Sequence, residues 1–223
     1  MKKVIIAVIF FAGIAYAQLN SYSPFSSKLS TGVQLGFSGG IGVQLNSTFS
    51  NFAQGFPFSA RIGISYIALD PGNSADVRKV FINDATDGVP EESGHRLDFR
   101  LDLLHQVDII TSNSYAFFGP RYSMFTGRFV YVGGNEDFDI TTNQFGVGGG
   151  LETYFRMAPK LNLVLSTGVD YYFSSAISGH DTAYNPDGDN VNPRHDYNFN
   201  DADNAVNQPK FDVRIMAGFN YSF

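Results

Sequence analysis

The 223-residue chain contains no cysteine and no tryptophan. Without cysteine, neither a disulfide nor a thiolate metal site can stabilise the fold. After the N-terminal apolar run, no stretch is apolar enough to form a transmembrane helix. No proline-rich or serine-rich linker divides the chain, so its length fits one barrel or one ordinary domain.

The N-terminus has the three parts of a secretory signal peptide. Two lysines precede an apolar run over residues 4–15, and Ala15-Tyr16-Ala17 is a small-x-small cleavage site. The run is short for the alternative, an uncleaved anchor helix. We therefore predict a signal peptide over residues 1–17, cleaved on export, and one mature domain over residues 18–223. The mature chain holds 13 basic and 21 acidic residues, so nucleic acid is not an expected partner.

The C-terminal residues 211–223 alternate between apolar side chains on one face and mostly polar or small ones on the other. Alternation with a period of two predicts a strand, and this segment is longer than the roughly 9–11 residues that a tilted strand needs to cross a bilayer. We expect an all-β fold: an eight-stranded antiparallel up-and-down transmembrane β-barrel with long extracellular loops. The other seven predicted strands cover residues 29–37, 41–49, 58–69, 96–106, 115–125, 145–156 and 161–173.

The first two of these strands are the least distinct, because residues 29–49 also fit one longer strand. A hairpin about Ser38-Gly39-Gly40 places one copy of Gly-Val-Gln-Leu in each arm and gives the even strand number of outer-membrane barrels. Proline cannot donate to a strand ladder, so Gly119-Pro120 predicts a β-bulge or a local bend. The glycine-rich residues 146–150 are followed by strand-like alternation, which argues against a phosphate-binding turn.

Loop lengths predict the orientation. Outer-membrane barrels keep their periplasmic turns short and their extracellular loops long. The short connections 108–114 and 157–160 are therefore expected in the periplasm, and the long segments 70–94, 127–141 and 174–209 outside the cell. These long segments contain 15 of the 21 acidic residues, so the outer surface is expected to be anionic.

The polar face of the strands indicates which side is inside. A soluble lipocalin-like barrel would bury the apolar face, but the polar face here is rich in glycine, which weakens a water-exposed strand. A basic side chain facing lipid at the midplane costs about 2–4 kcal/mol, and the apolar faces of the last six predicted strands carry no charge. We therefore expect a neutral network of paired charges that fills the lumen. Its members are Arg61, Asp98, Arg100, Asp102, Arg121, Glu152, Arg156, Asp170, Asp212 and Arg214.

The terminal Phe223, the export signal and the alternating segments together resemble the small outer-membrane β-barrel families, namely the OmpA transmembrane domain, the OmpX and OmpW types, and the outer membrane protein beta-barrel domain group. The resemblance covers essentially the whole mature chain and is one of pattern. It implies an integral protein of the outer membrane, in contact with membrane lipid and lipopolysaccharide. It also implies an assembly signal read by the barrel-assembly machinery, carried here by Phe211, Phe219, Tyr221 and Phe223.

The third long segment offers two weaker hypotheses. Asn185, Asp187 and Asp189 have the oxygen-rich spacing of a calcium loop, although Gly188 is misplaced and no glutamate stands at the twelfth position. The alternative is a merely solvated loop. No other cofactor is expected.

An enzyme that modifies outer-membrane lipid needs a nucleophile, a base and an orienting acid. The candidates are His95, His105, His180 and His195 with Ser174, Ser175 and Ser178. Their spacing fixes no such geometry. The function that we expect is therefore non-enzymatic: a barrel with a plugged lumen and an envelope-structural or surface-interaction role through its acidic loops. A narrow porin for small solutes and a lipid-modifying enzyme are the alternatives.

Overall fold

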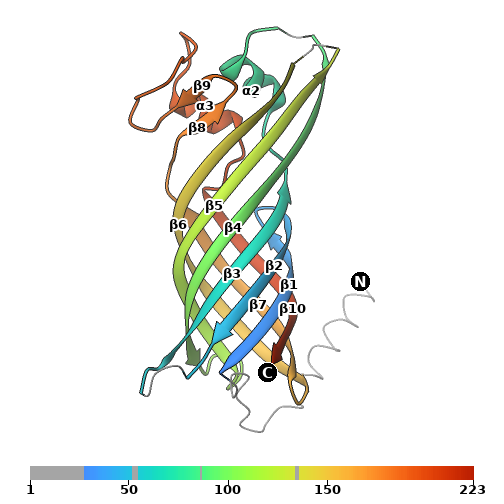
Figure 1. Cartoon of the computed structure of the whole chain (residues 1–223), viewed down its shortest axis with the longest axis vertical. Helices are drawn as coiled ribbons and strands as arrows, with labels where there is room; N and C mark the ends of the chain where they lie inside the picture. Colours follow the sequence, from blue (N-terminus) through green and yellow to red (C-terminus); the bar gives the residue numbers. More distant parts are fainter. Residues whose placement is uncertain (1–27, 52–54, 86, 134–135) are drawn as a thin grey trace.

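The computed structural model describes residues 28–51, 55–85, 87–133 and 136–223, so the predicted signal peptide lies outside the described residues. Eight strands form a closed antiparallel barrel (Figure 1). Each strand pairs with its neighbour in the chain, and the pairing of the first strand with the last closes the cylinder. The fold class is as predicted. The strands are β1 (Leu29–Ser38), β2 (Ile41–Phe49), β3 (Phe58–Leu69), β4 (Val89–Val107), β5 (Ser114–Val132), β6 (Glu136–Ala158), β7 (Leu161–Tyr172) and β10 (Phe211–Ser222).

The N-terminal segment forms two strands and not one long strand. β1 and β2 pair over their whole length, with Leu29 opposite Phe49 and Phe37 opposite Ile41. Gly39 has a φ of +70° in the turn between them, a backbone conformation that favours glycine. This hairpin makes the number of strands in the barrel even.

The barrel wall is inverted relative to that of a soluble protein. Large apolar side chains are exposed on the outer face, for example Leu35 at 64%, Ile41 at 71% and Phe145 at 69% exposure. Glutamine, asparagine, arginine and aspartate side chains are buried on the inner face. Such a wall is stable where its solvent is hydrocarbon and its backbone polar groups are all paired between strands. The lipocalin-like alternative is therefore excluded.

Three strands extend far beyond the others. β4, β5 and β6 rise above the rest of the cylinder in Figure 1, and β5 and β6 pair as far as Tyr131 and Glu136. The prediction of a loop over residues 127–141 is thus wrong, because most of that segment continues two strands. Its outward face carries charged residues beside Val130 and Val132, with an ion pair of 2.7 Å between Arg128 Nη2 and Asp137 Oδ2. Alternation of polar with apolar residues continues there, but the outer solvent is no longer hydrocarbon.

Most of the other two long segments folds into a cap over this end of the barrel, which we call the cap end. The predicted loop over residues 70–94 is too long, because residues 89–94 are the first part of β4. The cap contains helix α2 (Ser74–Phe81), hairpin strands β8 (Ile177–Gly179) and β9 (Thr182–Tyr184), and helix α3 (Phe199–Ala205). Asn73 and Asn198 cap the N-termini of the two helices with their side-chain oxygens. No helix in the described part of the chain is long and apolar enough to cross a membrane.

The opposite end of the barrel, which we call the turn end, carries the short connections 108–113 and 159–160. Gly119 and Pro120 lie in β5 without the predicted β-bulge. On the β6 side, Pro120 pairs with Val147. On the β4 side, the ladder has a gap opposite Leu101, and the register is the same before and after the gap. Proline has no N–H to donate to the ladder, so a gap in the pairing disturbs the sheet less than an inserted bulge residue would. A Cβ at Gly119 would lie 1.8 Å from the carbonyl oxygen of Leu101, so this approach requires glycine.

Candidate functional site

Charged side chains fill the barrel interior. Five arginines and five carboxylates are buried there: Arg61, Arg96, Arg100, Arg121 and Arg214 with Asp98, Asp102, Glu152, Asp170 and Asp212. The sequence prediction differs from this set at one position. Arg156 is exposed at the turn end, opposite Asn162 in the ladder, and Arg96 takes its place. Arg96 lies on the same strand face as Asp98, so the alternation of β4 already contained the signal that identifies it.

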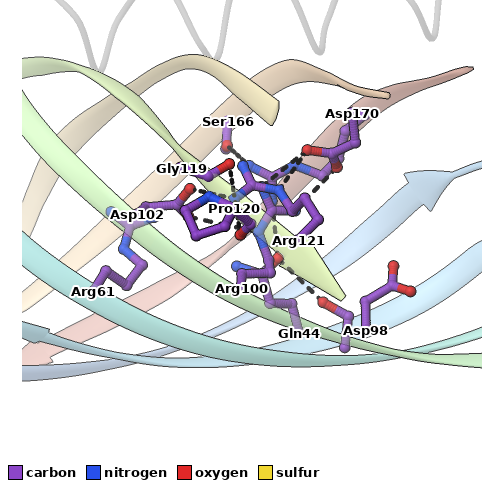
Figure 2. Close-up of polar contacts among 12 residues, drawn as sticks. Gln44, Arg61, Asp98, Arg100, Asp102, Gly119, Pro120, Arg121, Ser166 and Asp170 are labelled. Carbon is purple, nitrogen blue, oxygen red and sulfur yellow. Dashed lines mark hydrogen bonds and ion pairs between the residues drawn. The ribbon is translucent and has the colours of Figure 1, made fainter. Parts of the chain in front are cut away.

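Two aspartates bridge two arginines at the centre of the lumen (Figure 2). Arg121 Nη1 lies 2.7 Å from Asp102 Oδ1 in an ion pair, and Arg121 Nε donates to Asp170 Oδ1 at 2.7 Å. Arg100 lies 3.5 Å from Asp102 and 3.3 Å from Asp170. The four side chains come from β4, β5 and β7. Because each carboxylate faces two guanidinium groups, this cluster ties distant walls of the barrel together.

A second cluster lies nearer the cap end. Arg96 is within ion-pair distance of Asp98, at 3.2 Å, and of Asp212. It also donates to the carbonyl oxygen of Ser38 at 2.8 Å. The hydroxyl of Tyr172 donates to Asp98 Oδ2 at 3.3 Å. Arg96 thereby joins β4 to β1 and β10 on the far side of the lumen.

A third cluster lies nearer the turn end. Arg61 and Glu152 form a two-pronged ion pair across the barrel, with 2.7 Å between Nη1 and Oε2. Thr48 accepts from Arg61 Nε at 3.2 Å, and the Tyr154 hydroxyl donates to Glu152 at 2.5 Å. Beside this layer an apolar cluster lines the lumen, formed by Leu104, Tyr115, Phe117, Tyr154 and Val164.

Arg214 is the exception in this network. Its guanidinium donates to Gln44 Oε1 at 2.9 Å and to Ser166 Oγ at 3.1 Å, and lies 5.0 Å from the ring centre of Phe117. No carboxylate in the described ranges is within ion-pair distance of it. Neutral acceptors and an aromatic face therefore hold this buried charge.

Glycines on the inner face make room for the large side chains. A Cβ at Gly148 would lie 1.8 Å from Asp170 Oδ1, and one at Gly150 would lie 2.7 Å from the ring of Phe117. The glycine-rich residues 146–150 are thus part of a strand that faces a crowded lumen. A Cβ at Gly63, by contrast, would make only ordinary van der Waals contacts, the shortest at 3.4 Å from the carbonyl oxygen of Leu45.

Uncharged amides line another part of the lumen. Asn162 of β7 lies opposite Asn220 of β10, and Gly32 of β1 separates Asn220 from Asn46 of β2. All three asparagines are buried, and each has at least one side-chain amide atom without a hydrogen-bond partner in the protein. Buried polar atoms of this kind are usually satisfied by ordered water. This side of the lumen is therefore suited to hydration.

The cap closes the barrel with an apolar core. Side chains from the extended strands pack against side chains from the cap, and the buried members are Val77, Val80, Phe81, Phe125, Phe129, Tyr131, Phe138, Ile140, Ile177, Tyr184, Ala202, Ala205 and Val206. Polar contacts fasten the cap to itself and to the strands. Arg78 of α2 lies 2.6 Å from Glu136 of β6, and the Tyr184 hydroxyl donates to the carbonyl oxygen of Val80 at 2.8 Å.

An exposed ion pair links the two cap segments. Arg194 Nη2 lies 2.8 Å from Asp84 Oδ2, and another nitrogen of the same guanidinium donates to the carbonyl oxygen of Lys79. The hydrogen bond from Arg194 lowers the pKa of Asp84 below its ordinary value of 3.8. Because Asp84 is largely exposed, this pair orients the segments more than it stabilises them.

The residues proposed for calcium are close together but hydrogen-bond to one another. Asp187 Oδ1 accepts from the backbone N–H of Asp189 at 3.1 Å, and the Asn185 side chain donates to the carbonyl oxygen of Asp189. Within the described residues there is no group of three or more histidine, aspartate or glutamate side chains that could hold a metal ion. Calcium binding stays a prediction.

The histidines considered for catalysis are dispersed over the molecule. His95 stacks on Tyr66 on the outer wall, and His105 contacts the carbonyl oxygen of Pro57. His180 and His195 each contact only the aspartate that follows in sequence. Among the described side chains, the hydrogen bonds join no serine to these histidines, and Ser175 Oγ donates instead to the carbonyl oxygen of Asn143.

The aromatic residues proposed as an assembly signal share the outer face of β10. Phe211, Phe219, Tyr221 and Phe223 are all exposed there. Such side chains are accessible to a partner while the strand is being added to the barrel wall. Their recognition by the assembly machinery stays a prediction.

Comparison with known proteins supports the outer-membrane class. The chain is similar to a major outer membrane protein from Thermus thermophilus, with a TM-score of 0.70 and 25% sequence identity over 89% of this chain and 100% of that chain. Neisserial surface protein A gives a TM-score of 0.40 and 10% identity over 87% of this chain and 94% of its own, which is too weak to carry an argument. No protein-family model and no curated protein sequence matches. The OmpA, OmpX or OmpW type is not distinguished.

Proposed function

We propose that this eight-stranded outer-membrane β-barrel protein has no continuous pore and acts through its folded cap, which it presents at the cell surface. The proposal combines a structural role in the envelope with a surface-interaction role. Its lipid environment would be the outer membrane with its lipopolysaccharide, reached after export by the predicted signal peptide. Recognition of the aromatic residues of β10 by the barrel-assembly machinery is part of the same proposal.

The observation that carries the proposal is the presence of two closures in series. The ion-pair clusters occupy the lumen, with Arg121 at their centre in contact with both Asp102 and Asp170. Above them, the apolar core of the cap covers the mouth of the barrel. An eight-stranded barrel is only just wide enough for its own side chains. A hydrated ion would have to displace both closures to pass.

The surface role rests on the rigidity and the charge of the cap end. The cap has its own buried core and capped helices, so it offers a defined shape and not a set of mobile loops. Six acidic residues lie in each of the segments 70–94 and 174–209. A rigid anionic surface favours partners with basic patches and bound divalent cations over other anions.

Conductance of the purified protein in planar bilayers tests the absence of a pore. We expect no stable openings for the wild-type protein. Because the closures are in series, replacing residues 174–207 by a short Gly-Ser linker should by itself leave the barrel silent, since the ion-pair clusters still fill the lumen. Stable openings of porin size in the wild-type protein would refute the proposal. The shift in gel mobility on heating shows whether the variant is folded.

A second candidate, a narrow channel for small uncharged solutes, is favoured by the amide-lined side of the lumen. The buried amides of Asn46, Asn162 and Asn220 have atoms free for water or for a polar solute. Swelling of liposomes in isosmotic solute distinguishes this candidate. Swelling of wild-type proteoliposomes in glycerol, with loss of swelling in Asn220→Leu, would favour the channel. Absence of swelling favours the closed barrel.

A further inference from the structure

A groove crosses the outer wall of the barrel within the part that faces lipid. Its volume is about 690 Å³. The outward-facing side chains that line it are apolar apart from the hydroxyls of Thr31, Ser47 and Tyr122, and belong to five neighbouring strands and the edge of a sixth. These side chains are Thr31, Leu45, Ser47, Ile62, Ile64, Phe99, Leu101, Pro120, Tyr122 and Phe145.

The strand register explains the shape of the groove. One row of cross-strand neighbours consists of Leu45, Ile64, Phe99, Tyr122 and Phe145, which lie directly opposite one another from β2 to β6. The next row toward the turn end contains smaller side chains at its two ends. In this row, Ser47 of β2 precedes Ile62 and Leu101, and Pro120 of β5 follows them. The bulky row therefore forms one bank of the groove.

The groove has the dimensions of a single acyl chain. Adjacent strands are about 4.8 Å apart, so five strands span about 19 Å. One leaflet of a bilayer has a hydrocarbon thickness of about 15 Å, which is half of the whole core. Because barrel strands are tilted, a row of cross-strand neighbours also runs obliquely through the membrane. An extended chain that lies along this row would therefore follow the groove through most of one leaflet.

Two of the three hydroxyls lie together and indicate the end at which the polar part of a lipid would lie, whereas Tyr122 stands between Phe99 and Phe145 in the bulky row. Thr31 Oγ1 and Ser47 Oγ are 3.4 Å apart on the outer face. Ser47 is two residues from the end of β2 at the turn end, whereas Phe145 lies where β6 begins to pair with β7, toward the cap end. The end that carries the Thr31–Ser47 pair is thus near the predicted periplasmic boundary of the membrane, and the aromatic end points toward the outer leaflet.

We propose that this groove is a binding site for one acyl chain of a phospholipid of the periplasmic leaflet, with the ester region of the lipid near Thr31 and Ser47. Charged or hydrated ligands are excluded, because the groove opens only toward hydrocarbon and its outward-facing lining carries no ionised group. The hydroxyls can donate to an ester carbonyl, which an acyl chain of a glycerophospholipid supplies. The site does not depend on whether the lumen is closed.

Photo-crosslinking in vesicles tests the proposal. The protein is reconstituted into phosphatidylethanolamine and phosphatidylglycerol vesicles that contain a trace of phosphatidylcholine with a diazirine in the middle of one acyl chain. Carbenes insert with little selectivity, so labelling reports residence time. We expect peptides that contain Ile62 or Leu101 to be labelled at least fivefold more than peptides from the outer face of β10.

Two matched variants complete the test. Ser47→Leu places a larger side chain in the groove and should reduce the labelling at least threefold. Ala217→Leu makes a comparable change on the outer face of β10, outside the groove, and should leave the labelling unchanged. Both positions face lipid, so leucine preserves the wall. Equal labelling around the barrel, or no effect of Ser47→Leu, would overturn the proposal. Protein–protein crosslinks through the groove would also overturn it, since a second copy would then be the occupant.

Discussion

Removing one member of the Arg61–Glu152 pair gives the clearest test of how the lumen is held together. Both side chains are 1% exposed, so solvent screens neither charge. Breaking a buried pair by removing one partner costs about 3–5 kcal/mol, because an uncompensated charge stays behind. In Glu152→Leu, the hydrogen bonds left to Arg61 are those to Thr48 and Tyr154, each at 3.2 Å, and Asp102 attracts its charge from beyond ion-pair distance. Two such hydrogen bonds offset little of the loss, so we expect a destabilisation of at least about 3 kcal/mol.

The reverse substitution should cost less. In Arg61→Met the buried group left behind is the carboxyl of Glu152, which can take up a proton and become neutral, whereas a guanidinium in a protein cannot lose its charge. The double variant Arg61→Met with Glu152→Leu removes both charges. Its free energy of unfolding should be within about 1 kcal/mol of that of the wild-type protein, because a well-packed apolar pair of similar volume replaces an ion pair at little net cost.

The assay is equilibrium unfolding by urea in detergent, followed by far-ultraviolet circular dichroism, since the chain has no tryptophan to report by fluorescence. The four proteins form a double-mutant cycle. The reasoning is refuted if Glu152→Leu costs less than about 1 kcal/mol. It is equally refuted if the double variant loses as much stability as the two single variants added together, because the two charges would then not interact.

Three further predictions follow from local geometry. Gly148→Ala should destabilise the barrel strongly, because the new Cβ would meet Asp170 Oδ1 at 1.8 Å, whereas Gly63→Ala, with no contact under 3.4 Å, should be tolerated in the same urea assay. Phe129→Ala should cost about 3–5 kcal/mol of cap stability and expose the cap to limited proteolysis, since Phe129 is fully buried in the cap core. The pKa of Asp84 is lowered by Arg194, so their contact should be intact above about pH 4 and be lost as the pH falls through the folded pKa of Asp84. In the wild-type protein, proteolysis of the cap should speed up between pH 7 and pH 3 as this contact is lost. In Asp84→Asn, the same change of pH should increase the proteolysis rate less.

Alternation identified the membrane-facing parts of the strands because the barrel wall separates two different surroundings. Each outward residue meets hydrocarbon and each inward residue meets the lumen, so the period of two is visible in the sequence. The same reasoning failed over residues 127–141, where β5 and β6 leave the membrane. There the apolar side chains are on the inward face, with Phe129, Tyr131, Phe138 and Ile140 buried, and the outward face carries Arg128 and Asp137. Apolar residues have changed from the outward to the inward face, so a search for apolar residues at the outward positions ends before the strands do.

The interior charges were predictable as a set but not as partners. Parity along β4 places Asp98, Arg100 and Asp102 on one face, and Arg96 shares that parity. Parity also places Arg156 inward, although it lies too near the turn end to be buried. Which carboxylate meets which arginine depends on the stagger between strands that are distant in sequence, and no local pattern records that stagger.

The sequence by itself determined an eight-stranded wall with an apolar outside and a charged inside, because those properties repeat every second residue along each strand. Only the tertiary structure decided that the long segments at the cap end form a cap with a buried core. The apolar residues of that core come from β5, β6, α2, α3 and the β8–β9 hairpin. Each of these short pieces contributes only a few apolar residues, and the hydrophobic surface that they share exists only after the barrel brings them together.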